Sequence, residues 1–196
     1  MAALTRLGVP GSPEAWRALA FDVAGTVAVV GHVALDLDVV QASWAFDEVS
    51  GDASVLGVPT ERAVPPPGSG VLHANGVDRI DHVVYAVPDL DDGVAALTAV
   101  LGIQPRRRAR PRPEGPEMAF FRAGEAVLEV VGAGAGPALW GVAFRAPDLD
   151  ATVAAVREAG GPIGDPKPAV QGGRIASVWQ GHVGFRIAVM EPSSSL

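Results

Sequence analysis

The stretch that decides the fold is IDHVVYAVPDLDDGVAALTAVLG, residues 80–102. Its first part, Ile80–Val87, is rich in β-branched and aromatic residues, which suit a packed strand. Pro88 cannot donate a hydrogen bond within a sheet and closes the strand. Asp89 or Asp91 can then cap a helix whose apolar residues recur at helical spacing until a glycine ends it. The stretch therefore predicts a strand followed by an amphipathic helix.

The same unit occurs a second time in the chain, shifted so that position 82 corresponds to position 141. We call this constant shift the repeat offset. Residues 82–102 align without a gap with residues 141–161, GVAFRAPDLDATVAAVREAGG, and the motif PDLD occupies the same place in both. The repeat offset also relates the apolar segments 127–131 and 186–190. A repeat that keeps its register over this length indicates a duplicated structural unit. Each unit is expected to be a βαβββ module.

This pattern resembles the vicinal oxygen chelate superfamily, which includes glyoxalase I, bleomycin-resistance proteins and extradiol dioxygenases. The resemblance is carried by IDHVVYAVPDLD, by the strand pair MAFFRAG and AVLEVV, and by the second-module pair WGVAFRAPDLD and FRIAVMEP. It covers residues 80–192 well and residues 1–60 weakly. The superfamily includes lyases, isomerases, dioxygenases and binding proteins, so the resemblance is specific for the fold and poor for the reaction.

The resemblance implies an α+β fold in which paired βαβββ modules form a curved mixed β-sheet cup backed by helices. Residues 78–192 are expected to form this two-module domain. The modules would lie at about 78–134 and 138–192, and their helices near 91–101 and 150–159.

Residues 1–64 are predicted to be a degenerate third module. A strand at Leu4–Val9, a helix start at Ser12-Pro13-Glu14 and a hairpin around Gly31-His32 follow the same order. Residues 65–77 contain PPPGSG and have the composition of a linker. A lone third module leaves a sheet edge and an apolar face uncovered, so a homodimer formed through this segment is expected. The alternative is that the segment folds back over the paired modules of its own chain.

The composition excludes several classes of function. The chain has 196 residues, 48% of them apolar and 19% charged, which is typical of a globular protein. Its net charge of −7 argues against binding to nucleic acid or to anionic membranes, and a small-molecule partner is expected instead. Cysteine is absent, so there is no disulfide and no thiol nucleophile. No apolar run approaches the ~20 residues of a membrane span and no signal peptide is evident, so a cytoplasmic, arginine-rich bacterial protein is expected.

Two other segments have a functional and a structural interpretation. Residues 106–112 hold five arginines and could form an anion site, but the acidic balance of the chain favours a solvated strand or loop. The segment Gly132–Gly136 suggests a dinucleotide loop. A proline and a strand follow it where a helix would be needed, so we interpret it as the connection between the modules.

The superfamily resemblance assigns metal ligands to the first and last strands of each module, at positions occupied here by His82, Glu129, Gly141 and Ala188. An imidazole and a carboxylate suit Zn, Fe, Mn or Ni, whereas glycine and alanine have no donor side chain. A third ligand could come from His182, from Gln171 or from the segment 1–64. We therefore expect no cofactor, with a divalent metal as the alternative, and His82 and Glu129 as the candidate metal ligands and catalytic residues.

Strand alternation adds candidates for ligand binding. Side chains alternate between the faces of a strand, so Arg145 and Arg186 are expected on the cup face with His82 and Glu129. One arginine is expected to pair with Glu129, leaving the other for an anionic ligand. Phe120 and Trp179 correspond at the repeat offset and could flank a planar ligand; alternatively they are core or rim aromatics. The opposite face carries apolar residues: Val83, Tyr85, Val87, Leu128, Val130, Val142, Phe144, Ile187 and Val189.

Two classes of function follow. The first, which the sequence favours slightly, is binding of a small anionic or planar organic molecule, as in the drug-sequestering relatives. The second is a metal-dependent lyase, isomerase or ring-cleaving dioxygenase, in which a metal polarises two neighbouring oxygens and Glu129 ligates it or moves a proton. The sequence contains no Ser–His–Asp arrangement, P-loop or nucleotide fingerprint that would indicate a third route.

Overall fold

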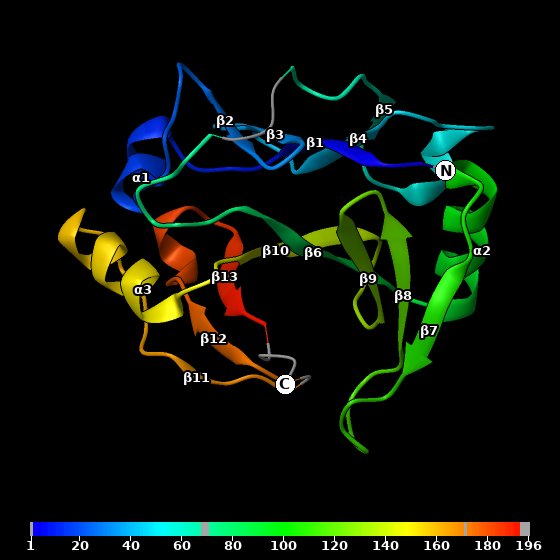
Figure 1. Ribbon diagram of the computed structural model, residues 1–196. Helices are drawn as coiled ribbons and strands as arrows, with labels where there is room; N and C mark the ends of the chain where they lie inside the picture. Colours follow the sequence, from blue (N-terminus) through cyan, green and yellow to red (C-terminus); the bar gives the residue numbers. More distant parts are fainter. Residues whose placement is uncertain (1, 68–70, 171, 193–196) are drawn as a thin grey trace.

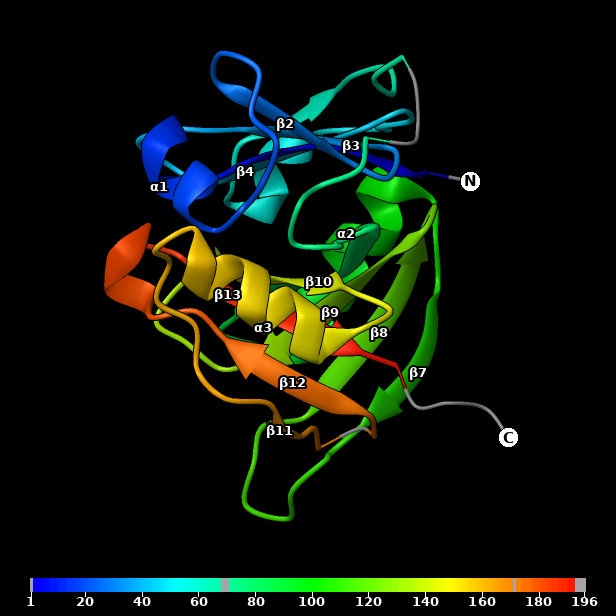
Figure 2. The same ribbon diagram turned by 60° about the vertical axis from the view of Figure 1, so that its left-hand side comes forward.

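The computed structural model describes residues 2–67, 71–170 and 172–192 (Figure 1). Its strands form two sheets: a small sheet of five strands from residues 4–62 and a large sheet of eight strands from residues 79–191. In both views the small sheet is stacked on one face of the large sheet (Figure 1, Figure 2). The two sheets therefore form layers around a shared interior.

The large sheet confirms the predicted α+β fold with paired βαβββ modules. The first module contains β6 (Arg79–Val87), α2 (Leu90–Leu101), β7 (Pro105–Ala109), β8 (Met118–Ala123) and β9 (Ala126–Gly132). The second contains β10 (Ala138–Arg145), α3 (Leu149–Glu158), β11 (Lys167–Pro168), β12 (Arg174–Ser177), the 3₁₀ turn η2 (Gln180–His182) and β13 (Arg186–Glu191). The strand order is β11-β12-β13-β10-β6-β9-β8-β7, and the modules meet at the antiparallel pair β10–β6. In each module the first strand runs parallel to the last.

Both long helices begin where the repeated PDLD motif predicts. The Asp89 side chain accepts hydrogen bonds from the backbone of Asp91 and Asp92 at the start of α2. Asp148 caps α3 in the same way. These aspartates satisfy amide groups that have no partner in the first helical turn and meet the positive end of the helix dipole. Gly102 ends α2 in the left-handed conformation, with φ of 64°.

Strand alternation correctly predicts the buried face of the large sheet. All nine apolar residues expected on the face opposite the cup are at most 3% exposed. Helix α2 packs on β8 and β9, and α3 packs on β12 and β13. The central strands β6 and β10 are left for another element to cover.

The small sheet contains β1 (Leu4–Gly8), α1 (Pro13–Ala18), β2 (Val27–Val30), β3 (Val33–Asp36), β4 (Ser43–Phe46), the 3₁₀ turn η1 (Ala53–Leu56) and β5 (Thr60–Arg62). Strand β1 is parallel to β3 and antiparallel to β4, β2 is antiparallel to β3, and β5 is parallel to β4. The same pairings connect β8-β9-β6-β10-β13 of the large sheet. The small sheet thus repeats the connectivity of the five central strands of the large sheet.

The small sheet covers the middle of the large sheet. The rings of Trp44 on β4 and Tyr85 on β6 lie 5.1 Å apart, and the Tyr85 hydroxyl donates a 2.6 Å hydrogen bond to the carbonyl of Leu56. Phe21, after α1, lies 5.1 Å from Phe144 on β10. The described part of the segment 1–64 therefore folds back over its own modules, which is the alternative considered from the sequence. The apolar face from which a homodimer was expected is covered within the chain.

Part of the predicted linker is anchored in the interior. His73 and Asn75 are 5% and 1% exposed. The His73 Nδ1 atom accepts a hydrogen bond from the Asp22 backbone, and the Asn75 side chain donates to the carbonyl of Leu19. Among the described helices, none is long and apolar enough to cross a membrane.

Candidate functional site

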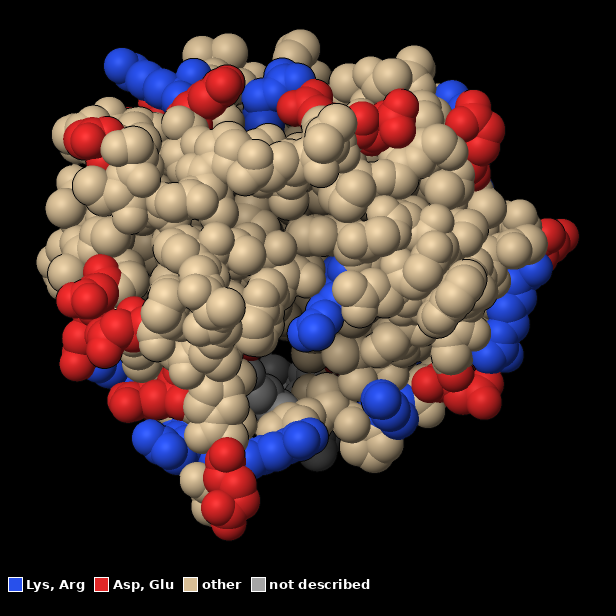
Figure 3. Space-filling model, turned by 180° about the vertical axis from the view of Figure 1, so that it is seen from behind, with Lys and Arg blue, Asp and Glu red and all other residues tan. Residues whose placement is uncertain are grey.

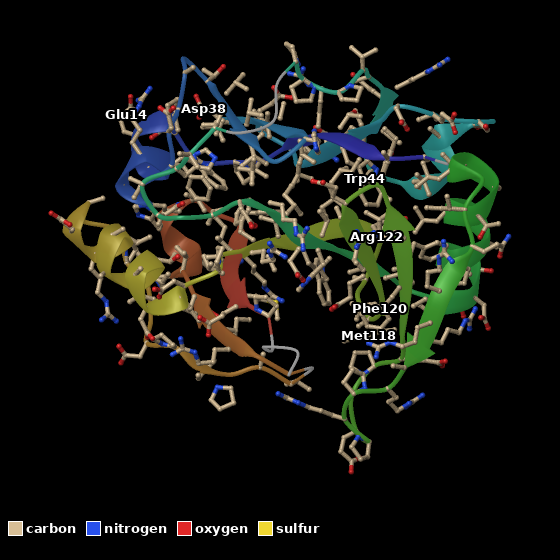
Figure 4. The ribbon with its side chains drawn as sticks, viewed as in Figure 1. Glu14, Asp38, Trp44, Met118, Phe120 and Arg122 are labelled. Carbon is tan, nitrogen blue, oxygen red and sulfur yellow. The ribbon has the colours of Figure 1, made fainter. Side chains whose placement is uncertain are left out.

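The open face of the large sheet forms a cup with a cavity of about 870 Å³. Its lining includes residues of the floor strands, the flanking strands and the loops between them: Asp81, His82, Arg106, Arg107, Arg112, Phe120, Val127, Glu129, Lys167, Ile175, Ser177 and Met190. Phe120 and its neighbour Met118 come from β8 (Figure 4). Figure 3 shows Lys and Arg side chains around a hollow in the lower part of the surface seen from behind. The cup is therefore large enough for a small organic molecule.

A β-bulge in β6 places two consecutive residues in the cup. Ala143 of β10 is opposite His82, and Phe144 is opposite Ile80, so Asp81 is the extra residue. Asp81 and His82 consequently both line the cavity, and Asp81 Oδ2 lies 2.8 Å from His82 Nδ1. Bulges re-aim side chains in this way. Strict alternation assigns Asp81 to the buried face, so the sequence reasoning missed it; a carboxylate among apolar positions was the available signal.

His82 and Glu129 lie together on the cup floor, as predicted. His82 Nε2 is 4.0 Å from Glu129 Oε2, and the side chains are 21% and 12% exposed. The hydrogen bond with His82 lowers the pKa of Asp81, so its ionised carboxylate accepts a hydrogen bond from the Nδ1–H group. In the neutral imidazole, Nε2 then carries the lone pair that faces Glu129. Burial raises the pKa of Glu129, although the charges of His82 and Arg107 oppose this.

This arrangement can move protons. Asp81 fixes the orientation of the imidazole, and Glu129 keeps its proton to a higher pH than an exposed glutamate does. The 4.0 Å separation is too long for a direct hydrogen bond. A ligand atom near both groups could exchange a proton with either of them.

The same residues form an incomplete donor set for a metal. The position on β10 that would supply a third ligand is Gly141, whose Cβ would lie 2.7 Å from the Arg186 carbonyl oxygen and 2.8 Å from the Arg186 Cβ. The close approach of β10 and β13 therefore leaves no room for a side chain there. Within residues 2–67, 71–170 and 172–192, no group of three or more His, Cys, Asp or Glu has an arrangement suited to a metal ion. His82 and Glu129 supply two donors, whereas catalytic zinc sites use three.

The prediction that an arginine pairs with Glu129 is wrong for Arg145, which pairs with another carboxylate. Its guanidinium donates to both oxygens of Asp78, at 3.1 and 2.7 Å. Asp78 directly precedes β6 and lies beside the end of β10, so it is the nearer carboxylate. Arg186 lies over the Trp140 ring, with its Cζ 5.3 Å from the ring centroid. Burial raises the pKa of Glu129, and the positive charge of a third arginine, Arg107, lowers it in part.

The arginine-rich strand is divided between the cup and the surface. A bulge between Pro105 and Arg107 lets the consecutive residues Arg106 and Arg107 both line the cup, and Arg112 lines it from the following loop. The interpretation of this segment as a solvated strand or loop is incomplete for these three residues, which are exposed and also line the cup. It is correct for Arg108, which pairs with Asp91 at 2.6 Å on the surface. The Arg107 guanidinium lies 4.6 Å from the centroid of the Phe120 ring.

Phe120 and Trp179, which correspond at the repeat offset in the sequence, do not occupy equivalent positions in the two modules. Phe120 is opposite Glu129, and in the second module Ser177 is opposite Ala188. The connection before β13 is longer than its counterpart before β9, so Ser177 is the counterpart of Phe120. Trp179 is 67% exposed and is not among the residues that line the cup.

His182, suggested as a third metal ligand, does not reach His82 and Glu129. His182 Nε2 lies 2.9 Å from the carbonyl of Ala15, at the small sheet. Gln171 lies outside the described residues. The structure thus brings His82 and Glu129 together, adds Asp81 and three arginines, and leaves Arg145, Trp179 and His182 elsewhere.

A smaller cavity of about 330 Å³ adjoins the cup and is called the side pocket here. It shares His82 and Ser177 with the cup. Its other lining residues are mostly apolar: Val84, Trp140, Gly141, Val142, Ala143, Val178, Gln180, Arg186, Ile187 and Ala188. His82 therefore stands where two cavities of different chemistry meet.

Comparisons with known proteins agree with this fold. A family model described as Glyoxalase/Bleomycin resistance protein/Dioxygenase superfamily matches residues 81–177. The methylmalonyl-CoA epimerase of Mycobacterium tuberculosis is 22% identical, with a TM-score of 0.56 over 64% of this chain and 95% of the epimerase. A Streptomyces coelicolor methylmalonyl-CoA epimerase in complex with 2-nitronate-propionyl-CoA is 23% identical, with a TM-score of 0.51 over 61% and 99%. A comparison with curated proteins found no match. At these identities the solved structures show a common fold, in agreement with the resemblance seen in the sequence.

Proposed function

Because this chain belongs to the glyoxalase/bleomycin resistance protein/dioxygenase superfamily through residues 81–177, we propose that its cup binds a small organic anion beside His82 and Glu129. The observation that carries the proposal is the charge of the cup. Its described lining holds four cationic residues, Arg106, Arg107, Arg112 and Lys167, against the two carboxylates Asp81 and Glu129. The chain as a whole carries a net charge of −7, so this local excess of positive charge opposes the general balance. Arginines bind carboxylates and phosphates through paired, charge-assisted hydrogen bonds.

The aromatic ring in the cup supports a planar ligand. Phe120 lies under the Arg107 guanidinium, so the two flat groups form a wall that a planar group can extend by stacking. Phe120 is also the residue opposite Glu129 in the β8–β9 pair. A planar anion bound against this wall would lie close to the carboxyl group with the raised pKa.

Proton transfer is the second candidate function. His82 and Glu129 present two groups that exchange protons, and Asp81 acts as a positioning residue for the imidazole. An isomerisation or epimerisation needs such a pair, because a proton is taken from one atom and returned to it or to another. The metal-dependent lyase, isomerase or dioxygenase considered from the sequence would use His82 and Glu129 as ligands, and a bound metal would polarise the substrate oxygens. The donor set supports this less well than metal-free binding.

The test is calorimetry with benzoate and its neutral analogue benzamide as probes. We expect benzoate to bind more tightly, and Arg107→Ala to weaken its binding by about tenfold, the loss of roughly one charge-assisted hydrogen bond. Arg145→Ala is the matched control, because this arginine is held by Asp78 away from the cup. Equal affinity for the two probes, or unchanged affinity in both Arg106→Ala and Arg107→Ala, would reject the proposal.

We also propose that residues 1–64, predicted from the sequence as one degenerate third module, are a reduced copy of the paired-module arrangement, joined by the linker 65–77 to the two-module domain 78–192. The repeated strand connectivity supports this. A homodimer stays a prediction. Its basis is that the edge strands of the two sheets could pair with another chain, because the apolar face of the small sheet is covered by the large sheet. Light scattering that gives the mass of one chain at micromolar concentration would reject the dimer. The cytoplasmic location also stays a prediction.

A further inference from the structure

We infer that the ligand has two unlike ends, an anionic group held in the cup and a flat apolar group held in the side pocket, joined by a short linker that passes His82. The inference rests on the proposed function, since it takes anion binding in the cup as given. It narrows the ligand to aryl-substituted acids, with the acid a carboxylate or a phosphate.

The two cavities are adjacent. The cup and the side pocket have volumes of about 870 and 330 Å³ and meet at two residues that line both, His82 and Ser177. A ligand confined to the cup would leave the side pocket filled with water against apolar walls. Filling it with an apolar group removes that surface from water, which is favourable.

The two cavities differ in chemistry. The cup holds Arg106, Arg107, Arg112 and Lys167. The side pocket has walls of Val84, Val178 and Trp140, and Arg186, the cation among its described lining residues, lies over the Trp140 ring. An anion is therefore better placed in the cup, and an apolar group in the side pocket.

The side pocket has a lining that suits a flat group. Gly141 forms part of its lining, and the approach of β13 keeps any side chain out of that position. The bare backbone and the adjacent indole of Trp140 give a lining of flat surfaces. Aromatic rings pack well on such surfaces, through offset or edge contacts with the indole.

His82 lies at the junction between the two ends of the ligand. His82 lines both cavities, and its Nε2 lies 4.0 Å from Glu129. The atoms that join the two ends of the ligand must pass this point. The linker atoms next to the acid would then lie beside the two groups that can move a proton.

The experiment is calorimetry on the full chain with the series benzoate, phenylacetate, 3-phenylpropionate and 4-phenylbutyrate. Acetate and butyrate lack the ring, the corresponding amides lack the charge, and phenyl phosphate separates a phosphate preference from a carboxylate preference. We expect the best arylalkanoate to bind at least tenfold more tightly than the alkanoate, with an optimum in linker length. Trp140→Ala should reduce this preference to near unity and leave alkanoate binding unchanged.

A second variant guards against a folding defect in Trp140→Ala. Val84→Phe fills the side pocket from the cup face and should also remove the aryl preference, while Trp179→Ala, exposed outside both cavities, should keep it. In the unaltered protein, nuclear Overhauser effects should connect the ligand ring with the Trp140 indole. Acids that bind without an aryl preference, or a preference that survives in both pocket variants, would overturn the inference and leave the proposed function intact. Amides that bind as well as acids would overturn the proposed function itself.

Discussion

Arg6 on β1 and Asp36 on β3 form an ion pair at the place in the small sheet that His82 and Glu129 occupy in the large sheet. In each case the basic residue pairs across the parallel strands with the residue two positions before the acid. In the small sheet, Arg6 Nε donates a charge-assisted hydrogen bond of 2.8 Å to the Asp36 carboxylate, so the two groups are already paired. The large sheet leaves 4.0 Å between the two groups. The large sheet alone therefore presents these two groups to a ligand.

Replacing Glu129 by glutamine and replacing Asp36 by asparagine are expected to change the free energy of unfolding in opposite directions. Glu129→Gln should stabilise the protein at neutral pH by about 0.5–2 kcal/mol, the usual gain when an unfavourably placed functional group is replaced, because a buried carboxylate lacks the water that would stabilise its charge. Because burial raises the pKa of Glu129 above its ordinary 4.5, its contribution to stability is complete at low pH and is lost as the pH rises through the folded-state value. The gain from Gln should therefore grow as the pH rises, as measured by urea unfolding between about pH 4 and 8.

Asp36→Asn is the control for that experiment. It should destabilise by about 0.5 kcal/mol, because the ion pair is partly exposed and surface pairs contribute little. A Glu129→Gln protein that is less stable than the unaltered chain at neutral pH would contradict the assigned environment of this carboxyl group.

Asp81 is expected to determine the tautomer of His82. In the unaltered protein the ionised carboxylate should hold the proton on Nδ1. Asp81→Ala should allow the Nε2-protonated form that free imidazoles prefer, and ¹⁵N NMR of the ring nitrogens reports this directly. Asp78→Ala, which breaks the bond to Arg145 only, should leave the His82 signals unchanged. Identical His82 spectra in all three proteins would remove Asp81 as a positioning residue.

Tyr85 provides a test of how the two sheets pack. It is the only tyrosine in the chain, and burial raises its pKa from 10.0 to about 12. Tyrosinate absorbance should therefore appear near pH 12, and stability should fall between about pH 10 and 12, because the folded state disfavours the ionised phenol. Tyr85→Phe leaves the Leu56 carbonyl without its donor and should cost about 1–3 kcal/mol. Ionisation at the ordinary pKa would show that the ring is not covered by the small sheet.

Gly141 is expected to tolerate no side chain. Gly141→Ala should cost about 1–3 kcal/mol, because the added methyl group meets backbone atoms of Arg186 that cannot move without separating β10 from β13. Gly136→Ala is the matched control in the preceding loop, where an added Cβ meets nothing within 4 Å. Thermal unfolding of the two variants distinguishes them, and equal stabilities would contradict the close approach of the strands.

Metal binding is expected to be weak, because the protein offers two donors in place of the usual three. Elemental analysis after dialysis against a mild chelator should find well under one equivalent of Zn, Fe, Mn or Ni per chain. Near-stoichiometric metal that is lost in Glu129→Gln and His82→Ala would instead support the metal-dependent enzyme.

The sequence was sufficient for those parts of the structure that depend on regular periodicity. The repeat offset predicted the two modules, and alternation predicted the buried face that includes Val83 and Phe144. The errors occur where the period is interrupted. The bulges at Asp81 and Arg106 each insert one residue and turn a side chain toward the cup, and no periodic pattern predicts an insertion.

Longer-range features were also beyond the sequence. A longer connection before β13 separates Trp179 from the position of Phe120, although the strands on either side keep the repeat. The pairing of Arg145 with Asp78 depends on which carboxylate lies beside the end of β10, which is a property of the assembled sheet. The packing of Trp44 on Tyr85 joins segments that share no pattern.

The stacking of the two sheets has a consequence for synthesis of the chain. The small sheet leaves the ribosome first, when Trp44 and the Leu56 carbonyl still lack the Tyr85 side chain of β6 that contacts both of them. This part of the apolar face stays uncovered until β6 has been translated, and transiently exposed apolar surface is prone to aggregation. We therefore expect the nascent chain to be most prone to aggregation before Tyr85 reaches Leu56.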